Sequence, residues 1–246
     1  MSDGSNKLKK FSDGMDKYLE KTIITIGRVF IGLLAIMTSS LPSFIEEIVN
    51  CIFTEIGTSD IYSFIDVNTL ISSATYVVFI IIFVFIARKY NIAKLSFNFI
   101  NKKNILIVIG GFVLYRIVVI VGYILLHIQG IESTANDTAI QELFENQSIV
   151  LMFITMSLYA PIVEELVFRA FLMGTLFKNY KAVVGILVSS TLFGIFHGPA
   201  DIVSFLIYFG GGLIFAITYY KTKRIEVTMC IHFINNLLAW VFTYIQ

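Results

Sequence analysis

Two adjacent glutamates and an arginine lie within one long apolar stretch, Ser148–Phe177. Glu165 and Arg169 are four residues apart with the acid on the N-terminal side, the orientation that favours an ion pair on one helix face. Glu164 lies about 100° further round the same helix and cannot share that arginine as easily. A carboxylate without a partner in a low-dielectric medium is a good candidate for a general base. The alternative is that both acids only join helices through polar contacts.

Histidines occupy two later apolar stretches. Phe193 and His197 are four residues apart, and so are His232 and Asn236, so each pair shares a helix face. His232 and Asn236 can present donors to one point, whereas Asn235 is a weaker candidate. Taken singly, each histidine is more often a packing residue or a polar contact between helices. Ionisable groups cost roughly 2.5–3.5 kcal/mol at the centre of a membrane helix, so each one is nevertheless a functional candidate.

The composition excludes a soluble protein. Only 14% of the 246 residues are charged and 57% are hydrophobic, whereas a soluble domain carries about a quarter charged residues. The net charge of +1 gives no argument for a nucleic-acid partner. The two cysteines, Cys51 and Cys230, lie in very different segments, so we expect neither a disulfide nor a thiolate metal site.

Seven apolar stretches have approximately the length needed to cross a bilayer, which is about 20 residues. We therefore predict an all-α fold, a polytopic membrane helix bundle of about seven transmembrane helices. The third stretch contains Arg116, for which the motif acids are the expected partners, and the sixth contains Gly210–Gly212, a predicted site of close helix packing. The stretches are Thr22–Phe44, Thr69–Ala87, Ile105–Ile128, Ser148–Phe177, Ala182–Gly198, Ile202–Tyr220 and Val227–Ile245.

The basic residues predict the orientation of these stretches. Fifteen of the 18 lysines and arginines fall in the N-terminal tail and in alternate loops, and the opposite loops are acidic. The positive-inside rule then places the N-terminus in the cytoplasm and the C-terminus outside, in a membrane that we expect to be a bacterial plasma membrane. The first stretch is predicted to be an anchor and not a cleaved signal. Two outer segments, Glu46–Ile56 and Ala139–Glu145, could be short interfacial helices.

The depths expected for the polar residues do not agree well. Glu164 is 16 residues from Ser148 and 14 from Lys178, which at the α-helical rise is about 20–24 Å. His197 is about 16 residues from the cytoplasmic end of its stretch, but His232 is only 8 residues from Arg224. Helix tilt or a misplaced span boundary must reconcile these depths if the residues meet.

Together the three motifs resemble one family. Glu-Glu-x-x-x-Arg, Phe-x-x-x-His and His-x-x-x-Asn on separate spans, in this order, resemble the CPBP intramembrane proteases. That family comprises the type II CaaX prenyl endopeptidases and the bacterial bacteriocin-processing and self-immunity (Abi) proteins. The resemblance covers about 100 residues, from 148 to the C-terminus. With the charge pattern, we predict three regions: a cytoplasmic tail (1–21), N-terminal membrane helices with acidic outer loops (22–147), and a catalytic core of four membrane helices that resembles the family (148–246).

The resemblance implies endopeptidase chemistry with defined roles. Glu164 would take a proton from water and return it to the leaving amine, while His197 would hold the same water. His232 and Asn236 would donate hydrogen bonds to the tetrahedral oxyanion. The expected partners are the lipid bilayer and a peptide or membrane-anchored protein substrate, in bacteriocin or pheromone peptide processing or in self-immunity.

Three points stay open. Glu165 with Arg169 would either fix the helix or position substrate through the arginine. A divalent metal such as Zn²⁺ could be held by Glu164, His197 and His232 with an open water position, although no His-Glu-x-x-His motif is present and we favour a metal-free mechanism. The alternative function is a non-proteolytic immunity or adaptor protein of the same fold. A small transporter is less favoured because no inverted repeat is visible.

Overall fold

The computed structural model describes residues 37–56, 67–177 and 180–245, and no strand occurs among them. Every element below belongs to one compact unit that begins at Ser39. The predicted cytoplasmic tail and most of the first apolar stretch lie outside the described residues. The all-α prediction is confirmed for the rest of the chain.

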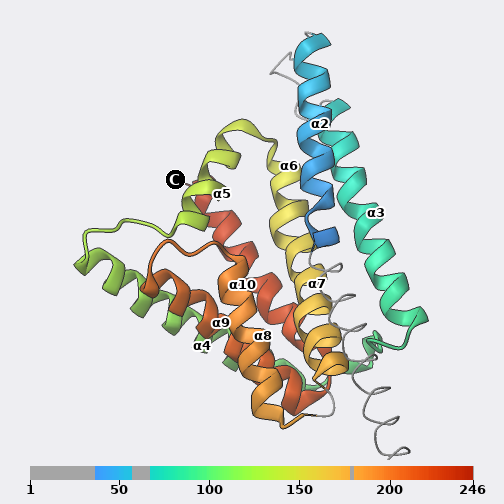
Figure 1. Ribbon diagram of the computed structural model, residues 1–246, viewed down its shortest axis with the longest axis vertical. Coiled ribbons are helices and arrows are strands. Elements are labelled where there is room, and N and C mark those ends of the chain that lie inside the picture. The colour runs from blue at the N-terminus through green and yellow to red at the C-terminus, as the bar shows by residue number, and fades with distance from the viewer. Residues whose placement is uncertain (1–36, 57–66, 178–179, 246) are drawn as a thin grey trace, which may run out of the picture. The chain divides into compact units, whose positions relative to one another are not determined.

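Within the described part of the chain, five helices are long and apolar enough to cross a membrane, and the chain is an integral membrane protein. They are α3, α4, α9, α10 and the continuous helical segment Ile149–Leu176. In chain order the elements are α2 (Leu41–Ile56), α3 (Val67–Lys89), η1 (Phe97–Phe99), α4 (Lys102–Ile128), α5 (Ala135–Asn146), α6 (Ile149–Met152), η2 (Phe153–Tyr159), α7 (Ala160–Glu165), η3 (Leu166–Leu176), α8 (Ala182–Phe196), α9 (Ile202–Thr222) and α10 (Ile225–Ile245) (Figure 1).

Some predicted boundaries were wrong. The helix expected at Glu46–Ile56 begins earlier, at Leu41, so it includes the predicted end of the first stretch. The fifth stretch forms only a 15-residue helix, α8, because Gly198 adopts a left-handed conformation with φ of 57° and Pro199 follows it. The outer segment predicted at Ala139–Glu145 is helical and lies within α5.

The motif-bearing span is not a regular α-helix. Its segments η2 and η3 are π-helical, and the Ala160 N–H accordingly bonds to the Thr155 carbonyl, five residues back. Bonds that reach one residue further put more residues into each turn, so the α-helical rise overestimates the depth of Glu164. This π-helical geometry is one cause of the disagreement between the depths expected for Glu164, His197 and His232 from the sequence. π-Helical segments are rare and frequent at functional sites.

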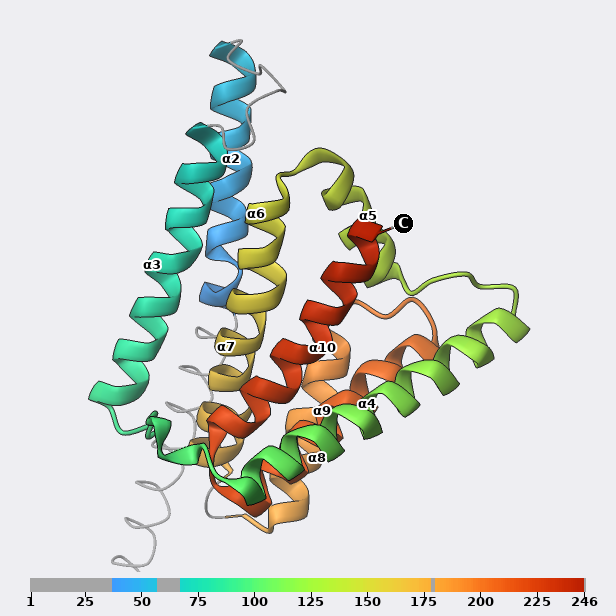
Figure 2. The same ribbon diagram turned by 180° about the vertical axis from the view of Figure 1, so that it is seen from behind.

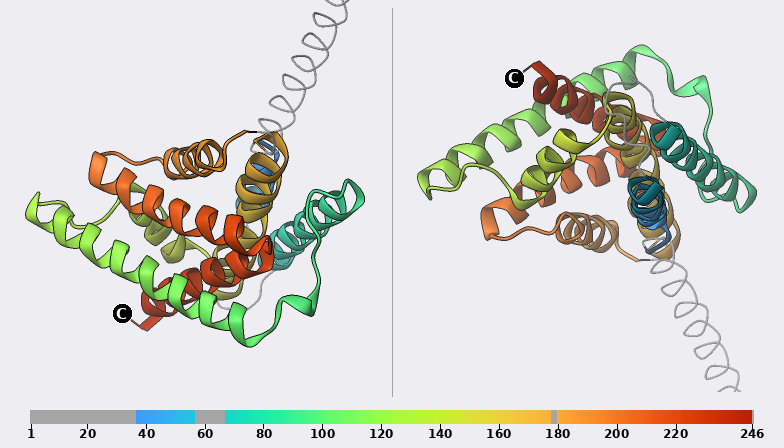
Figure 3. Two further views of the ribbon diagram at one scale, coloured as in Figure 1. Left: turned by 90° about the horizontal axis from the view of Figure 1, so that it is seen from below. Right: turned by 90° about the horizontal axis from the view of Figure 1, so that it is seen from above.

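Helix α10 packs against α4, α9 and the motif-bearing span (Figures 2 and 3). Helix α9 is in turn packed closely on both of its neighbours through the glycines predicted for that role. A Cβ on Gly212 would lie 3.0 Å from the Ser190 Cα of α8, and one on Gly211 would lie 2.7 Å from the Tyr115 ring of α4. Helix α9 therefore lies against the backbone of α8 and against a tyrosine ring of α4.

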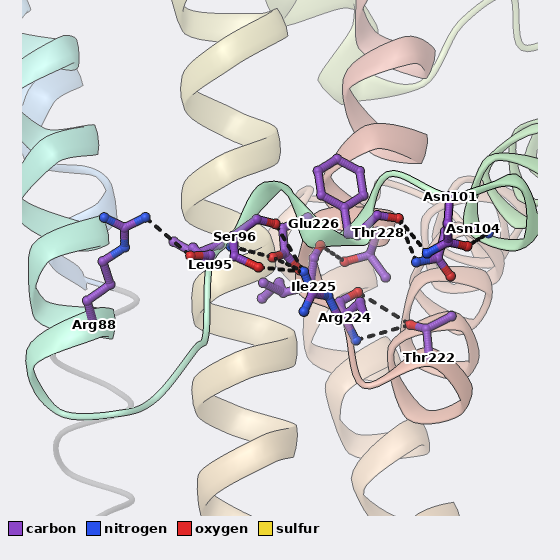
Figure 4. A network of polar contacts seen from close by, with 11 residues as sticks. Arg88, Leu95, Ser96, Asn101, Asn104, Thr222, Arg224, Ile225, Glu226 and Thr228 are labelled. Carbon is purple, nitrogen blue, oxygen red and sulfur yellow. Dashed lines mark hydrogen bonds and ion pairs between the residues drawn. The ribbon is translucent and has the colours of Figure 1, made fainter.

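The connection between α3 and α4 is tied to the start of α10 (Figure 4). The Ser96 N–H donates to Glu226 Oε1 at 2.8 Å, and Arg224 Nη2 donates to the Ser96 carbonyl and hydroxyl, both at 3.0 Å. Arg224 also forms an ion pair with Glu226 at 3.0 Å. These contacts fix the beginning of the helix that carries His232 two turns later.

Candidate active site

A buried ion pair and a histidine form the centre of the site. Arg169 Nη1 lies 3.1 Å from Glu165 Oε1, and both side chains are fully buried. His232 Nδ1 lies 3.3 Å from the same oxygen. An ionised carboxylate only accepts hydrogen bonds, so Nδ1 of His232 must carry a proton. The structure thus brings together Glu165 from α7, Arg169 from η3 and His232 from α10.

Aromatic rings enclose the Arg169 guanidinium. Its carbon lies 4.4 Å from the centre of the Phe193 ring and 5.2 Å from that of Phe215. Nη2 donates to the Gly212 carbonyl at 3.1 Å. Phe215 also stacks on the His232 ring, with centroids 4.8 Å apart. The charge on Arg169 is therefore stabilised by Glu165, one carbonyl and two ring faces.

Glu164 has a different environment from its neighbour. Its Oε2 atom is buried but has no hydrogen-bond partner among the described residues, and its side chain keeps 16% exposure. His232 Nε2 lies 4.0 Å from this oxygen, which is too long for a direct hydrogen bond and suits a bridging water. Of the two adjacent acids, Glu165 is held by charged partners and Glu164 is left available.

His197 lies beside this centre, separated from it by an aromatic ring. The Phe193 ring is 4.5 Å from the ring of His197 and 5.8 Å from that of His232. His197 Nδ1 lies 2.7 Å from the Phe193 carbonyl, which can only accept, so its Nε2 is left as an acceptor when the ring is neutral. No direct contact joins His197 to either glutamate in the part of the chain that the structure describes.

The predicted metal ligands do not form a metal site in this arrangement. Among the described residues, no group of three histidine, cysteine, aspartate or glutamate side chains is placed to hold a metal ion. Glu164, His197 and His232 therefore do not lie close enough together to form a set of metal ligands.

Asn236 is anchored to the π-helical part of the motif-bearing span. Its Nδ2 donates to the Met156 carbonyl at 2.9 Å, and Asn235 Nδ2 donates to its Oδ1 at 3.3 Å. An amide nitrogen carries two hydrogens, so one N–H of Asn236 remains for another acceptor. The expectation for Arg116 was wrong: its Nη1 donates to Asn235 Oδ1 at 2.9 Å, and the motif acids are not its partners.

Tyr208 on α9 is a residue that the sequence did not single out. Its ring stacks on His197, with centroids 4.3 Å apart and planes 17° apart. Its hydroxyl is 2.7 Å from Thr134 Oγ1 and donates to Asp137 Oδ1 at 3.3 Å. An aromatic residue in an apolar helix carries no signal that separates this role from ordinary packing, and the same holds for Phe193 and Phe215.

Residues 146–238 match the family described as Rce1-like, type II CAAX prenyl endopeptidase Rce1-like. This part of the chain is thus similar to a family of membrane proteases. All seven residues of the three motifs lie within the match, whereas Arg116 and the helices α2–α4 precede it.

Three bacterial proteins are similar to this chain. YdiL of Bacillus subtilis (strain 168), a candidate membrane peptidase by its name, is 39% identical over 37% of this chain and 36% of its own length. The UPF0177 protein YvdC of Lactococcus lactis subsp. lactis (strain IL1403) is 29% identical over 73% of this chain and 68% of its own. The membrane-embedded CAAX protease MroQ of Staphylococcus aureus (strain USA300) is 30% identical over 54% and 55%. The aligned part thus spans from about a third to two thirds of these relatives, and no solved structure matches the chain.

Proposed function

We propose that the protein is an intramembrane endopeptidase that hydrolyses a peptide or a membrane-associated protein with water activated by Glu164. The observation that supports this most strongly is the contrast between two adjacent acids. Glu165 is fully buried and paired with Arg169 and His232, whereas Glu164 has an unpartnered oxygen facing His232 Nε2. A structural role needs only the first of these acids.

The proposed reaction has two steps. In the first, a water oxygen attacks the carbonyl carbon of the scissile peptide, and the proton that it loses passes to the Glu164 carboxylate. In the second, the tetrahedral intermediate collapses, the C–N bond breaks, and Glu164 returns the proton to the leaving nitrogen. His232 Nε2 lies 4.0 Å from Glu164 Oε2, so both groups can act on the same water when substrate is bound.

The remaining polar groups complete the proposed chemistry. His232 donates from Nε2 to the oxyanion when its ring carries both protons. The free N–H of Asn236 is the second donor. His197 accepts the other hydrogen of the attacking water at Nε2, and Phe193 sets its distance from His232.

We also propose seven membrane crossings with the N-terminus in the cytoplasm and the C-terminus outside. This count includes the predicted first stretch and the short α8. The basic ends of α3, α4 and α9 and the start of α10 point to one side (Figure 2), which supports the orientation by the positive-inside rule. The three bacterial relatives support a bacterial plasma membrane. Peptide maturation, as of a bacteriocin or pheromone, or self-immunity remains the proposed biological setting.

The decisive experiment compares Glu164→Gln with the wild type in cells and in purified form. We expect peptidomics to show cleavage products lost by about 10²–10⁴-fold, with the variant still present in the membrane. Glu47→Gln, an exposed acid on α2, is the matched control and should cleave normally. A parallel sample with a chelator tests the metal alternative directly.

Full activity of Glu164→Gln would overturn the proposal. The alternative is a non-proteolytic immunity or adaptor protein. It predicts that cells keep the immunity phenotype that this protein confers when His197 and His232 are both replaced by alanine. Loss of the phenotype together with loss of the peptides favours the protease.

A further inference from the structure

Arg116 is a cation in the middle of a membrane helix with no acidic partner among the described residues. It lies 14 residues from the start of α4 and 12 from its end. Placing an arginine there is costly, so a contact must compensate. Its Nη1 donates a hydrogen bond to Asn235 Oδ1 at 2.9 Å, across 119 residues of sequence.

This contact begins a chain of hydrogen bonds in which donor and acceptor can be assigned at every step. Arginine only donates, so Asn235 must accept at Oδ1 and donate from Nδ2 to Asn236 Oδ1, 3.3 Å away. Asn236 must then donate from Nδ2, which it does to the Met156 carbonyl at 2.9 Å. The orientation of an amide side chain is ordinarily ambiguous. Here a donor-only group at one end and an acceptor-only group at the other define both amides.

Pro161 explains why the Met156 carbonyl needs this donor. In η2 the bonds reach five residues back, as that from Ala160 to Thr155 does. The next bond in this register would join the N–H of residue 161 to the carbonyl of Met156. Proline has no N–H, so that carbonyl has lost its partner in the helix. The amide of Asn236 on α10 replaces this missing donor. Pro161 lies three residues before Glu164 in the motif-bearing span.

We propose that Arg116 and Asn235 are positioning residues that hold the Asn236 amide in its reactive orientation. In this orientation one N–H satisfies Met156 and the other stays free for the oxyanion. Flipping the amide would place an oxygen against the Met156 carbonyl and leave an acceptor where the reaction needs a donor. This inference rests on the proposed function, and it assigns a role to α4, which lies outside the region that matches the family.

The test measures kcat and KM on the most readily cleaved member of a library of fluorescence-quenched peptides, with the full-length protein in detergent micelles. Losing one oxyanion donor costs about 10²–10³-fold in kcat. Misorienting that donor in Arg116→Met or Asn235→Leu should cost part of this, about ten-fold, with KM unchanged. Arg116→Lys keeps a charged donor and should recover kcat to within about three-fold of the wild type.

A second comparison separates positioning from a general structural role. In an Asn236→Ala background, Arg116→Met should cause no further loss of kcat, because Arg116 acts through Asn236. Melting temperatures measured on the same samples show whether each variant is folded. If Arg116→Met is not folded, Asn235→Leu takes its place in this comparison.

The opposite outcomes overturn the inference. They are a wild-type kcat in both single variants, or the same ten-fold loss from Arg116→Met when Asn236 is already alanine. Glu164→Gln is assayed alongside to keep the two proposals apart. Cleavage by that variant overturns both, whereas an inactive Glu164→Gln with a fully active Arg116→Met overturns the role of Arg116 alone.

Discussion

Removing one charge of the buried Arg169–Glu165 pair should destabilise the protein more than removing both. The two side chains are completely buried and 3.1 Å apart. Arg169→Met leaves an unpaired carboxylate in the bundle, and breaking a buried pair in this way costs about 3–5 kcal/mol. Glu165→Gln leaves the guanidinium without its counter-ion and should cost a similar amount.

The double variant, Arg169→Met with Glu165→Gln, contains no uncompensated charge. What it still loses is the hydrogen bond from Arg169 to the Gly212 carbonyl, and an unsatisfied buried acceptor costs about 1–3 kcal/mol. The double variant should therefore recover roughly 2 kcal/mol relative to either single variant.

The assay is the free energy of unfolding in detergent micelles, followed by far-UV circular dichroism against denaturant. Arg88→Met is the control, because Arg88 is an exposed arginine at the end of α3 and should change the stability by less than about 0.5 kcal/mol. If the double variant loses as much as the two single variants added together, the two charges do not stabilise each other and the reasoning is refuted.

Three further tests, each with its own variants, concern the surroundings of the site. Tyr208→Phe keeps the ring on His197 and should retain kcat, whereas Tyr208→Leu loses the stacking, about 0.5–1.5 kcal/mol, and should slow cleavage by about 2–10-fold. Gly212→Ala places a Cβ 3.0 Å from α8 backbone and should cost about 1–3 kcal/mol of unfolding free energy, whereas Gly110→Ala meets nothing within 4 Å and should cost none. At the start of α9, hydrogen bonds from a serine hydroxyl and two backbone N–H groups hold the pKa of the Asp201 carboxyl below its usual value. The stability that this carboxylate adds to the fold is therefore complete above the unfolded pKa of about 3.9 and is lost as the pH falls through the lower folded pKa. Circular dichroism should no longer detect this pH dependence in Asp201→Ala.

The fold class could be predicted because it depends on local properties. Apolar length and scarcity of charge indicate membrane helices wherever they fold, and the motif residues stand out as exceptions in such a background. The end of α8 could also be read locally from Gly198 and Pro199. The role of Tyr208 could not, because an aromatic side chain in an apolar helix is equally suited to lipid, to core packing and to a histidine.

The depth of Glu164 shows the limit of local reasoning. A rise of 1.5 Å per residue assumes α-helical bonds, but η2 and η3 bond five residues back. That register persists only where neighbouring groups supply the donors and acceptors that it leaves unpaired. Asn236 does so for the Met156 carbonyl, and the Ser189 hydroxyl donates to the Phe168 carbonyl at 2.8 Å.

The sequence by itself determined that this is a helical membrane protein, and it named the acids, histidines and amide of a candidate site. Only the tertiary structure decided that His232 contacts Glu165 and that Arg116 contacts Asn235. The physical reason is that spacing along one helix specifies a shared face, whereas a partner 67 or 119 residues away depends on how separate helices pack.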